Sequence, residues 1–301
     1  MNYLFEHFKR YRKDLFIGVT VGLVVGFVAL ITGLGLQPAM ASHPKTLSSI
    51  ADSAPMPELP ITDQSSVEDI LTLMKNSHNL WKTLNADVLT VWQPAREPQT
   101  VYTNIQIEQI SKARLTIQQY NNDNKQMFDV LWVSDGEKAY EQDNLSKRYT
   151  EYTLPTFAQS VDDFGLQSNS SLGDSVIIRH PMAVLIPSPI ADYLYPTGLM
   201  QRQGKLEVLG TDKVSSREAV VIAWVGFDEK GLLTGKATFW VDSYTGVILK
   251  ALVYGGETWD DVAEETTIVS IVFDKEIEAE VFAFKSSPDF EYLPLEKFYN
   301  H

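Results

Sequence analysis

Ten short stretches of this chain alternate between apolar and polar residues, and this period of two limits the fold more than any other feature of the sequence. Five of them lie within residues 100–154 and five within residues 204–274, with polar turns between them. Side chains of a strand point alternately to its two faces, so the alternation predicts half-buried strands. Asp135 and Gly136, between two of the stretches, favour a hairpin turn. We predict a mainly β (α+β) fold with one large antiparallel sheet, strongly curved or partly closed, with inserted helices.

Two helices are expected beside this sheet. Apolar residues recur every three or four positions from Ser66 to Asn85, and Ser65 and Glu68 have the spacing of a capping box, which predicts one amphipathic helix. Between the two groups of strands, residues 186–201 carry a short helical pattern that a proline ends. His78 lies at the edge of the first helix's apolar stripe, and we interpret it as a boundary residue rather than a metal ligand.

The N-terminus predicts export of the rest of the chain. Residues 15–36 form a 22-residue run without a charge, which as a helix would reach about 33 Å, the thickness of a hydrocarbon core. The basic residues within positions 1–14 should remain in the cytoplasm. We therefore expect a single-pass transmembrane anchor in the cell membrane. A cleaved signal peptide is the alternative, because Ala39 and Ala41 form a small-x-small site that would be cut after Ala41.

The segments that follow predict a stalk and one exported domain. Residues 37–63 contain four prolines and no sustained period, as expected of a semi-extended stalk. Residues 64–301 are then the extracytoplasmic domain. Within the apolar run, Gly18, Gly22 and Gly26 would share one helix face and could support a dimer, although glycine is common in membrane helices.

Composition excludes several functions. The formal net charge is −14, and residues 1–14 carry +2, so the remainder carries −16 and does not suit nucleic acid. The chain has no cysteine, which rules out disulfides, thiolate metal sites and cysteine nucleophiles. No nucleotide-binding, hydrolase or zinc-protease motif occurs, and the five histidines are scattered. We interpret the acidic run at residues 255–265 as a solvated loop rather than a calcium site. The sequence predicts no catalytic residues, metal or cofactor.

Three segments in the second half carry a family resemblance. Residues 208–225, 239–254 and 266–284 follow one another as strand pairs that end in an acidic link and Phe-x-Phe, and residues 132–143 form a strand, Asp-Gly, strand hairpin. This run resembles the LolA-like group, which comprises the outer-membrane lipoprotein carriers and the RseB/MucB regulators of anti-sigma factors. The resemblance covers about residues 67–284. It implies an incomplete barrel whose concave side is lined with apolar side chains and closed by helices. The alternative is a plain sheet core without a cavity.

The resemblance also implies where a ligand would lie, because the hollow receives acyl chains in the carriers. We expect Val247, Leu249, Ala251 and Val253 to face one way, and Ile248, Leu252 and Tyr254 the other. The candidate cavity residues are Trp132, Phe239, Val241, Val247, Leu249 and Val253. Arg114 stands at a place comparable to an arginine that holds the carriers closed, so it is a candidate gating residue. An exposed sheet arginine is the alternative.

Three functions remain open on these grounds. The first is a non-enzymatic, membrane-anchored extracytoplasmic domain that binds a lipid, a lipoprotein acyl chain or an apolar peptide. The second is an envelope sensor like RseB and MucB, with a membrane anti-sigma factor as its partner. The third is a structural surface domain without a ligand. The sequence does not identify the ligand or the oligomeric state.

Overall fold

The computed structural model describes residues 56–93, 97–155, 158–159, 182, 186, 190–197, 204–228, 230–256 and 258–299. The chain divides into two compact units, Met1–Pro44 and Lys45–His301, and every described residue belongs to the second unit. Among these residues, no helix has the length and apolar character needed to cross a membrane. The predicted anchor at residues 15–36, its glycine face and the site after Ala41 lie outside the described residues.

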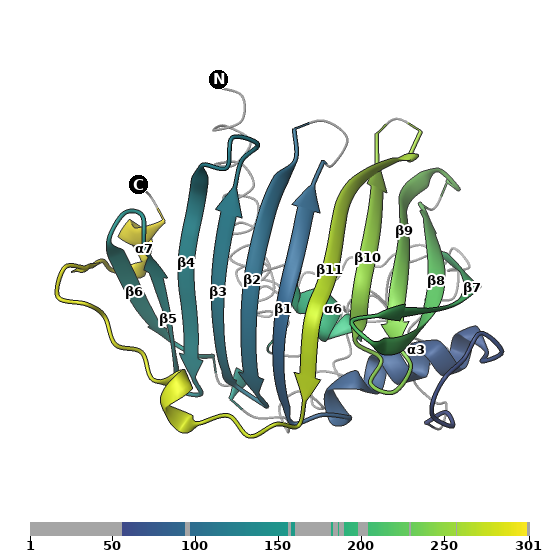
Figure 1. Cartoon of the computed structure of the whole chain (residues 1–301), viewed down its shortest axis with the longest axis horizontal. Helices are drawn as coiled ribbons and strands as arrows, with labels where there is room; N and C mark the ends of the chain where they lie inside the picture. The colour runs from purple at the N-terminus through teal and green to yellow at the C-terminus, as the bar shows by residue number, and fades with distance from the viewer. Residues whose placement is uncertain are drawn as a thin grey trace, which may run out of the picture. The chain divides into compact units, whose positions relative to one another are not determined.

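One large sheet organises the described part of the chain, as the alternation predicts (Figure 1). Its twelve strands run in the order β12-β6-β5-β4-β3-β2-β1-β11-β10-β9-β8-β7. All neighbours are antiparallel except β12 and β6. The strands are β1 Thr83–Trp92, β2 Gln99–Glu108, β3 Lys112–Tyr120, β4 Gln126–Asp135, β5 Lys138–Asp143, β6 Arg148–Thr153, β7 Lys205–Val214, β8 Arg217–Phe227, β9 Leu233–Asp242, β10 Ile248–Gly255, β11 Asp261–Phe273 and β12 Glu291–Tyr292.

The strand that joins the two halves of the sheet was not predicted. The helix expected over Ser66 to Asn85 is wrong in its extent, because α3 covers only Val67–Asn76 and a 3-10 turn follows at Ser77–Asn79. β1 then begins at Thr83, pairs with β2 on one side and with β11 on the other, and so links the first meander to the second. Leu84 fits a helical period and a strand period equally well, which explains the overrun.

The capping box of α3 lies one residue later than predicted. The Ser66 hydroxyl accepts a hydrogen bond from the backbone N–H of Asp69 at 3.1 Å, and the Asp69 carboxylate accepts one from the backbone N–H of Ser66 at 3.1 Å. These two bonds satisfy donors that the first turn of a helix leaves unpaired. The predicted hairpin at Asp135-Gly136 is confirmed between β4 and β5, where Gly136 has φ +104°.

A C-terminal strap, residues 274–299, was not predicted either. It includes the 3-10 turn η5 Ala279–Phe282, the short strand β12 and the helix α7 Leu295–Phe298. The Phe284 ring stacks on Tyr140 of β5 with 4.7 Å between centroids, and β12 adds to the edge of β6. Figure 1 shows this segment in yellow, running from the end of β11 to the β6 edge. The strap thereby covers one edge of the sheet.

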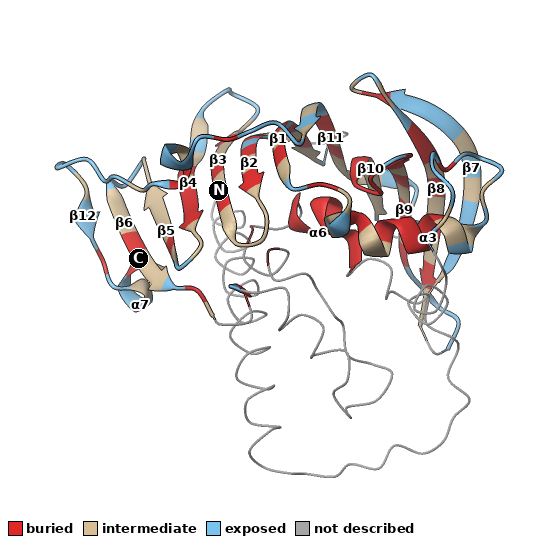
Figure 2. Ribbon diagram, turned by 90° about the horizontal axis from the view of Figure 1, so that it is seen from below, coloured by how far each residue is buried: buried red, intermediate tan, exposed pale blue. Residues whose placement is uncertain are grey.

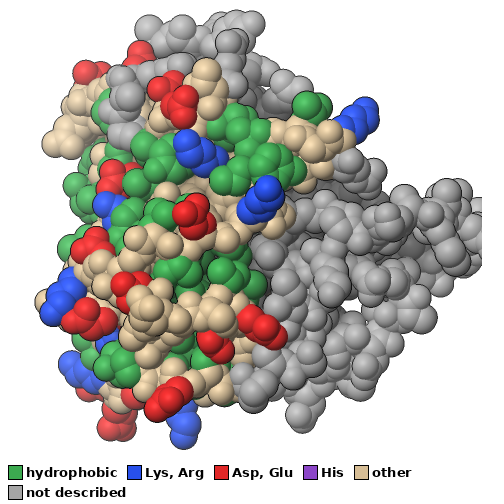
Figure 3. Space-filling view, turned by 90° about the vertical axis from the view of Figure 1, so that its right-hand side faces the viewer, with side chains coloured by type: hydrophobic (Ala, Val, Ile, Leu, Met, Phe, Trp, Pro, Cys, Tyr) green, Lys and Arg blue, Asp and Glu red, His purple; other side chains and the backbone are tan. Residues whose placement is uncertain are grey.

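The opposite edge strand is β7, and two of its features disfavour pairing with a further strand. Its ladder with β8 shifts register between Val208 and Gly210, and lysines occupy positions 205 and 213. Bulges and lysines are common devices on exposed edge strands. Figure 3 looks at this end of the sheet and shows hydrophobic side chains gathered beside Lys or Arg side chains. Leu232 is 62% exposed here, and Lys205 lies 5.9 Å from the ring centroid of Phe227.

The sheet is curved, and Figure 2 shows it as an arch with α3 and the short helix α6 (Ile190–Leu194) on its concave side. Two buried apolar clusters contact these helices. The first cluster joins β1–β5 and part of β10 and β11 to α6, and the second joins β8–β10 to α3. The curved antiparallel sheet is confirmed, and helices contact its concave face.

The expected alternation along β10 is wrong at one point. Ile248 pairs with Val241 and Lys250 with Trp240, so Leu249 is an extra residue that forms a β-bulge. Because of this shift, Ile248 and Ala251 share one buried cluster while Val247 and Leu249 belong to the other. A one-residue insertion reverses the phase of every residue after it.

Candidate functional site

The concave face of the central strands is built from rows of side chains that cross the sheet. Residues directly opposite each other in an antiparallel ladder point to the same side, so the register identifies each row. Three neighbouring rows are almost entirely apolar and share the cluster of α6. They are Ala113, Ile107, Leu84 and Phe273; then Leu115, Ile105, Ala86 and Ile271; then Ile117, Thr103, Val88 and Ile268.

The next two rows along the same strands contain both polar and apolar side chains. One contains Gln119, Val101, Thr90, Thr266 and Ala251, and the outermost contains Gln99, Trp92, Glu264 and Val253. We call Thr90, Gln99, Gln119, Glu264 and Thr266 the polar band. Thr90, Thr266 and Gln119 are buried, whereas Gln99 and Glu264 are half-buried. The concave face is therefore amphipathic along the strand direction, apolar at one end and polar at the other.

A directed hydrogen-bond network fixes the carboxylate of Glu264. The Tyr193 hydroxyl of α6 donates to Glu264 Oε1 at 2.7 Å, and the Thr266 hydroxyl donates to the same oxygen at 3.0 Å. The Thr90 and Thr266 hydroxyl oxygens are 2.9 Å apart. Because the single hydrogen of Thr266 goes to Glu264, Thr90 must be the donor in that pair. The second carboxylate oxygen, Oε2, accepts no hydrogen bond from any residue that the structure describes.

Glu264 also has no counter-ion among the described residues. The neighbouring Glu265 points to the opposite face of β11 and pairs with Lys250 at 2.9 Å. No ion pair in the described part of the chain includes Glu264. Among the described residues, the two hydroxyl groups at Oε1 are the groups that stabilise this carboxylate, which leaves Oε2 available to a donor on a ligand.

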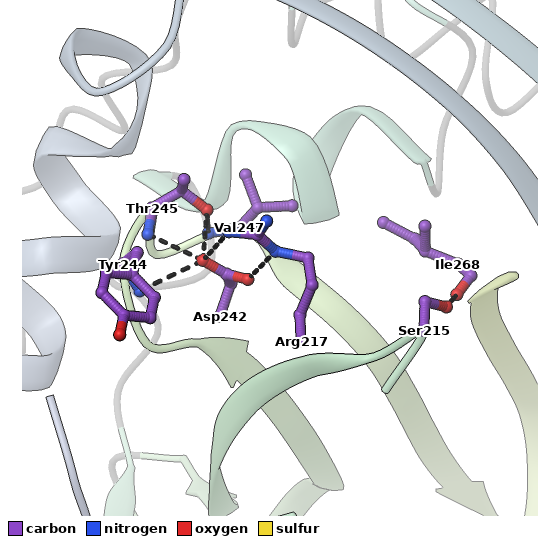
Figure 4. Close-up of polar contacts among 7 residues, drawn as sticks. All are labelled: Ser215, Arg217, Asp242, Tyr244, Thr245, Val247 and Ile268. Carbon is purple, nitrogen blue, oxygen red and sulfur yellow. Dashed lines mark hydrogen bonds and ion pairs between the residues drawn. The ribbon is translucent and has the colours of Figure 1, made fainter. Parts of the chain in front are cut away.

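A second buried carboxylate shows the contrasting case (Figure 4). Asp242 is fully buried at the turn between β9 and β10, and both of its oxygens are used within the protein. It pairs with Arg217, whose Nη2 lies 3.1 Å from Oδ1, and it accepts hydrogen bonds from the backbone N–H groups of Tyr244 and Thr245 and from the Thr245 hydroxyl. Its partners all lie in or beside this turn, so Asp242 holds the hairpin and offers nothing to a ligand.

The structure distributes the predicted cavity residues over both clusters. Trp132 is buried in the first cluster with Val247 and Leu249, and its indole N–H donates to the Tyr152 hydroxyl at 3.1 Å. Burial raises the pKa of Tyr152 to about 12. Phe239 and Val241 pack in the second cluster with residues of α3. Val253 alone lies at the polar band, directly opposite Glu264.

Arg114 does not join the other candidates. Its neighbour Leu115 points into the first cluster, so Arg114 points to the convex face. There its Nη1 lies 3.4 Å from the carbonyl oxygen of Val281 in the strap. The residue therefore contacts the strap rather than the concave face.

Sequence reasoning missed the Glu264 network for two reasons. Thr90 belongs to β1, which was not predicted, and Glu264 was assigned to a solvated acidic loop. β11 in fact begins at Asp261, so Glu264 and Glu265 are strand residues on opposite faces. Residues 262–267 run Val-Ala-Glu-Glu-Thr-Thr, which does not alternate, so no local signal placed Glu264 in a strand.

Other sites are sparse in the described residues. A groove of about 300 Å³ lies beneath the strap on the convex face, lined by Asn85, Gln106, Val272, Lys275, Glu276, Ile277, Glu278 and Val281. No group of three or more histidine or acidic side chains is placed to hold a metal ion within this part of the chain.

Comparisons with known proteins found similar solved structures but no matching family. No protein-family model and no curated protein matches the sequence. Among solved structures, an uncharacterised conserved protein from Thermus thermophilus matches with a TM-score of 0.40 and 11% identity, over 76% of this chain and 99% of that one. MucB matches with a TM-score of 0.38 and 13% identity, over 72% of this chain and 62% of MucB. A LolA superfamily protein from Nitrosomonas europaea matches with a TM-score of 0.24 and 10% identity, over 74% and 98%.

The structures similar to this chain thus include both a LolA superfamily protein and MucB, the two branches that the sequence resembles. This chain spans less than two thirds of MucB.

Proposed function

We propose that this chain is a non-enzymatic, membrane-anchored extracytoplasmic domain that binds an acyl chain, carried by a lipid or by an acylated protein. The observation that supports this function is the amphipathic concave face. Its three apolar rows would contact a hydrocarbon tail, and its polar band would contact the head of the same molecule. Removing apolar surface from water contributes about 0.8 kcal/mol per methylene, so a tail of a dozen methylenes can exceed the ordering cost of one flexible ligand.

Ligand entry requires the cover of the concave face to move. Leu84, Ile105 and Leu115 are fully buried, and α6 contributes Ala191 and Leu194 to the same cluster. α6 has only five residues, and its Tyr193 hydrogen bond to Glu264 joins it to the polar band. We propose that the Ala191 and Leu194 side of α6 shifts away from the apolar rows when a tail binds, while Tyr193 keeps its hydrogen bond to Glu264, because the tail would replace the apolar contacts that α6 makes.

Retained lipid tests the proposed function directly. The full chain, expressed in a bacterial envelope and released from detergent micelles, should show a bound lipid mass by native mass spectrometry. Ala86 lies in an apolar row, so Ala86→Leu fills space on the concave face and should reduce the bound fraction. Asn85→Leu is the matched control, because the adjacent residue points to the convex face and should leave lipid binding unchanged.

Two outcomes would contradict the acyl-binding function. One is a wild-type chain that carries no lipid and takes up no fluorescent acyl probe at micromolar concentration. The other is equal lipid retention in both variants at equal thermal stability. In the first case, binding of a membrane anti-sigma factor becomes the function to test, by co-purification of the full chain with such a protein.

A further inference from the structure

We infer that the polar band selects amphiphiles whose head is a primary ammonium group, and that Glu264 is the residue that contacts this head. The inference rests on the proposed acyl-binding function and adds the chemical class of the head group. It is drawn from the Glu264 network, which consists of Thr90, Tyr193, Glu264 and Thr266.

Within these four residues, the atoms left to contact a ligand are hydrogen-bond acceptors. The hydroxyl hydrogens of Tyr193 and Thr266 both go to Glu264 Oε1, and that of Thr90 goes to Thr266. What remains are Oε2 of Glu264 and a lone pair of Thr90. An ammonium group has three N–H donors and no acceptor, so it complements this arrangement. A phosphate or carboxylate head would find no donor in the network and would meet the Gln99 amide and the Trp92 indole N–H only beside the charge of Glu264.

Charge leads to the same class of ligand. The two polar rows contain no lysine or arginine, and the nearest basic residue along the ladder, Lys250, lies on the opposite face with Glu265. The formal net charge of −14 adds an attractive field for cations. An anionic head would therefore be repelled by the single charge of the band and by the whole domain.

The position of Glu264 fits the two ends of such a molecule. Val253 lies directly opposite Glu264, and the Thr90 and Thr266 row separates Glu264 from the first apolar row. An ammonium group at Oε2 would direct the attached chain toward Val88 and Ile268, which begin the apolar rows. Head and tail would then each meet groups of matching polarity.

The test compares three amphiphiles with the same eight-carbon tail. Octylamine, octan-1-ol and octanoate are titrated calorimetrically at pH 7 into the full chain held in lipid nanodiscs, with protein-free nanodiscs as the blank. A hydrogen bond to a charged group is worth more than a neutral one, so octylammonium should bind about ten- to a hundredfold more tightly than octanol, and octanoate more weakly. Glu264→Gln should reduce the affinity for octylammonium to that for octanol.

Glu265→Gln is the matched control, because it removes an equal charge from the adjacent residue on the other face. It should leave the preference for octylammonium intact. Tyr193→Phe is a second variant, needed if Glu264→Gln does not fold, and it should lower the preference by loosening the carboxylate while octanol binds as before.

Four outcomes are decisive. Loss of the preference in Glu264→Gln with retention in Glu265→Gln supports the inference. Equal affinity of the wild type for all three amphiphiles overturns it and leaves the acyl-binding function standing. Equal loss of the preference in both glutamine variants also overturns it, since the attraction would come from the overall charge. Failure of every amphiphile to bind the wild type overturns the acyl-binding function itself.

Discussion

His78 lies between α3 and β1, where burial makes its protonation unfavourable. Desolvation lowers its pKa from the usual value of 6.5, and a hydrogen bond with the backbone of Lys75 offsets part of that shift. Its backbone carbonyl also accepts a hydrogen bond from the Gln109 side chain at 2.7 Å. The neutral imidazole is therefore the form that suits the folded state.

We predict that this histidine makes the domain sensitive to acid. The unfolded chain takes up a proton at His78 below pH 6.5 while the folded chain does not, so stability is full above pH 6.5 and is lost as the pH falls toward the lowered pKa. Urea unfolding at pH 7.5 and pH 5.5 should show a smaller loss of stability for His78→Gln than for the wild type. An identical loss in both proteins would show that His78 titrates normally in the folded state.

At this scale, the sequence predicts burial better than it predicts role. The candidate cavity residues Trp132, Phe239 and Leu249 are all buried, because large apolar residues in alternating stretches belong to a core. Glu264 and Glu265 are chemically identical neighbours, however, and only the register of β11 directs one to the concave face and the other to Lys250. No local pattern in an acidic run distinguishes them until the start of the strand is known.

At the scale of elements, α3 packs directly on the turn between β9 and β10. A Cβ atom at Gly246 would lie 2.7 Å from the backbone oxygen of Leu73, and Gly246 has φ +73°. Gly231 has a similar φ of +76°, but a Cβ there would meet nothing within 4 Å. The two glycines therefore separate the cost of the backbone conformation from the cost of the contact.

We predict that Gly246→Ala destabilises the domain much more than Gly231→Ala. The positive φ should cost each variant about 1 kcal/mol of unfolding free energy. Gly246→Ala should lose about 1–3 kcal/mol more, because backbone atoms of α3 must move to admit the methyl group. Chemical denaturation of both variants measures the difference. Equal destabilisation would mean that α3 does not press on this turn.

The elements themselves were largely predictable, with two instructive exceptions. Ten strands with clear alternation and good turn residues were identified, because both signals are local. The expected helix extended into β1 because Leu84 satisfies both the helical and the strand period. The bulge at Leu249 does not change the hydrophobic pattern of "GVILKALVY", so the sequence does not predict it. Ladder register is a property of two strands at once, and one strand's sequence does not contain it.

At the scale of the whole molecule, the export of the domain is open to direct test. The proposal places residues 37–301 outside the cytoplasmic membrane. Protease added to intact spheroplasts should then degrade the domain and leave a short N-terminal fragment, visible by immunoblot with an N-terminal tag. A cytoplasmic protein in the same cells is the control and should survive. Survival of the domain would reject its export, and a soluble product that begins at Ser42 would show that the segment is cleaved.

The central position of β1 affects how this protein folds while it is being synthesised. β1 is the first strand to leave the ribosome or the export channel, and its partner β11 is nearly the last. The meander from β1 to β6 can pair as it emerges, but one edge of β1 stays open throughout the synthesis of β7 to β10. An open strand edge is a template for pairing with other chains. During that interval, the free edge of β1 is the part of the nascent domain that neighbouring copies could pair with.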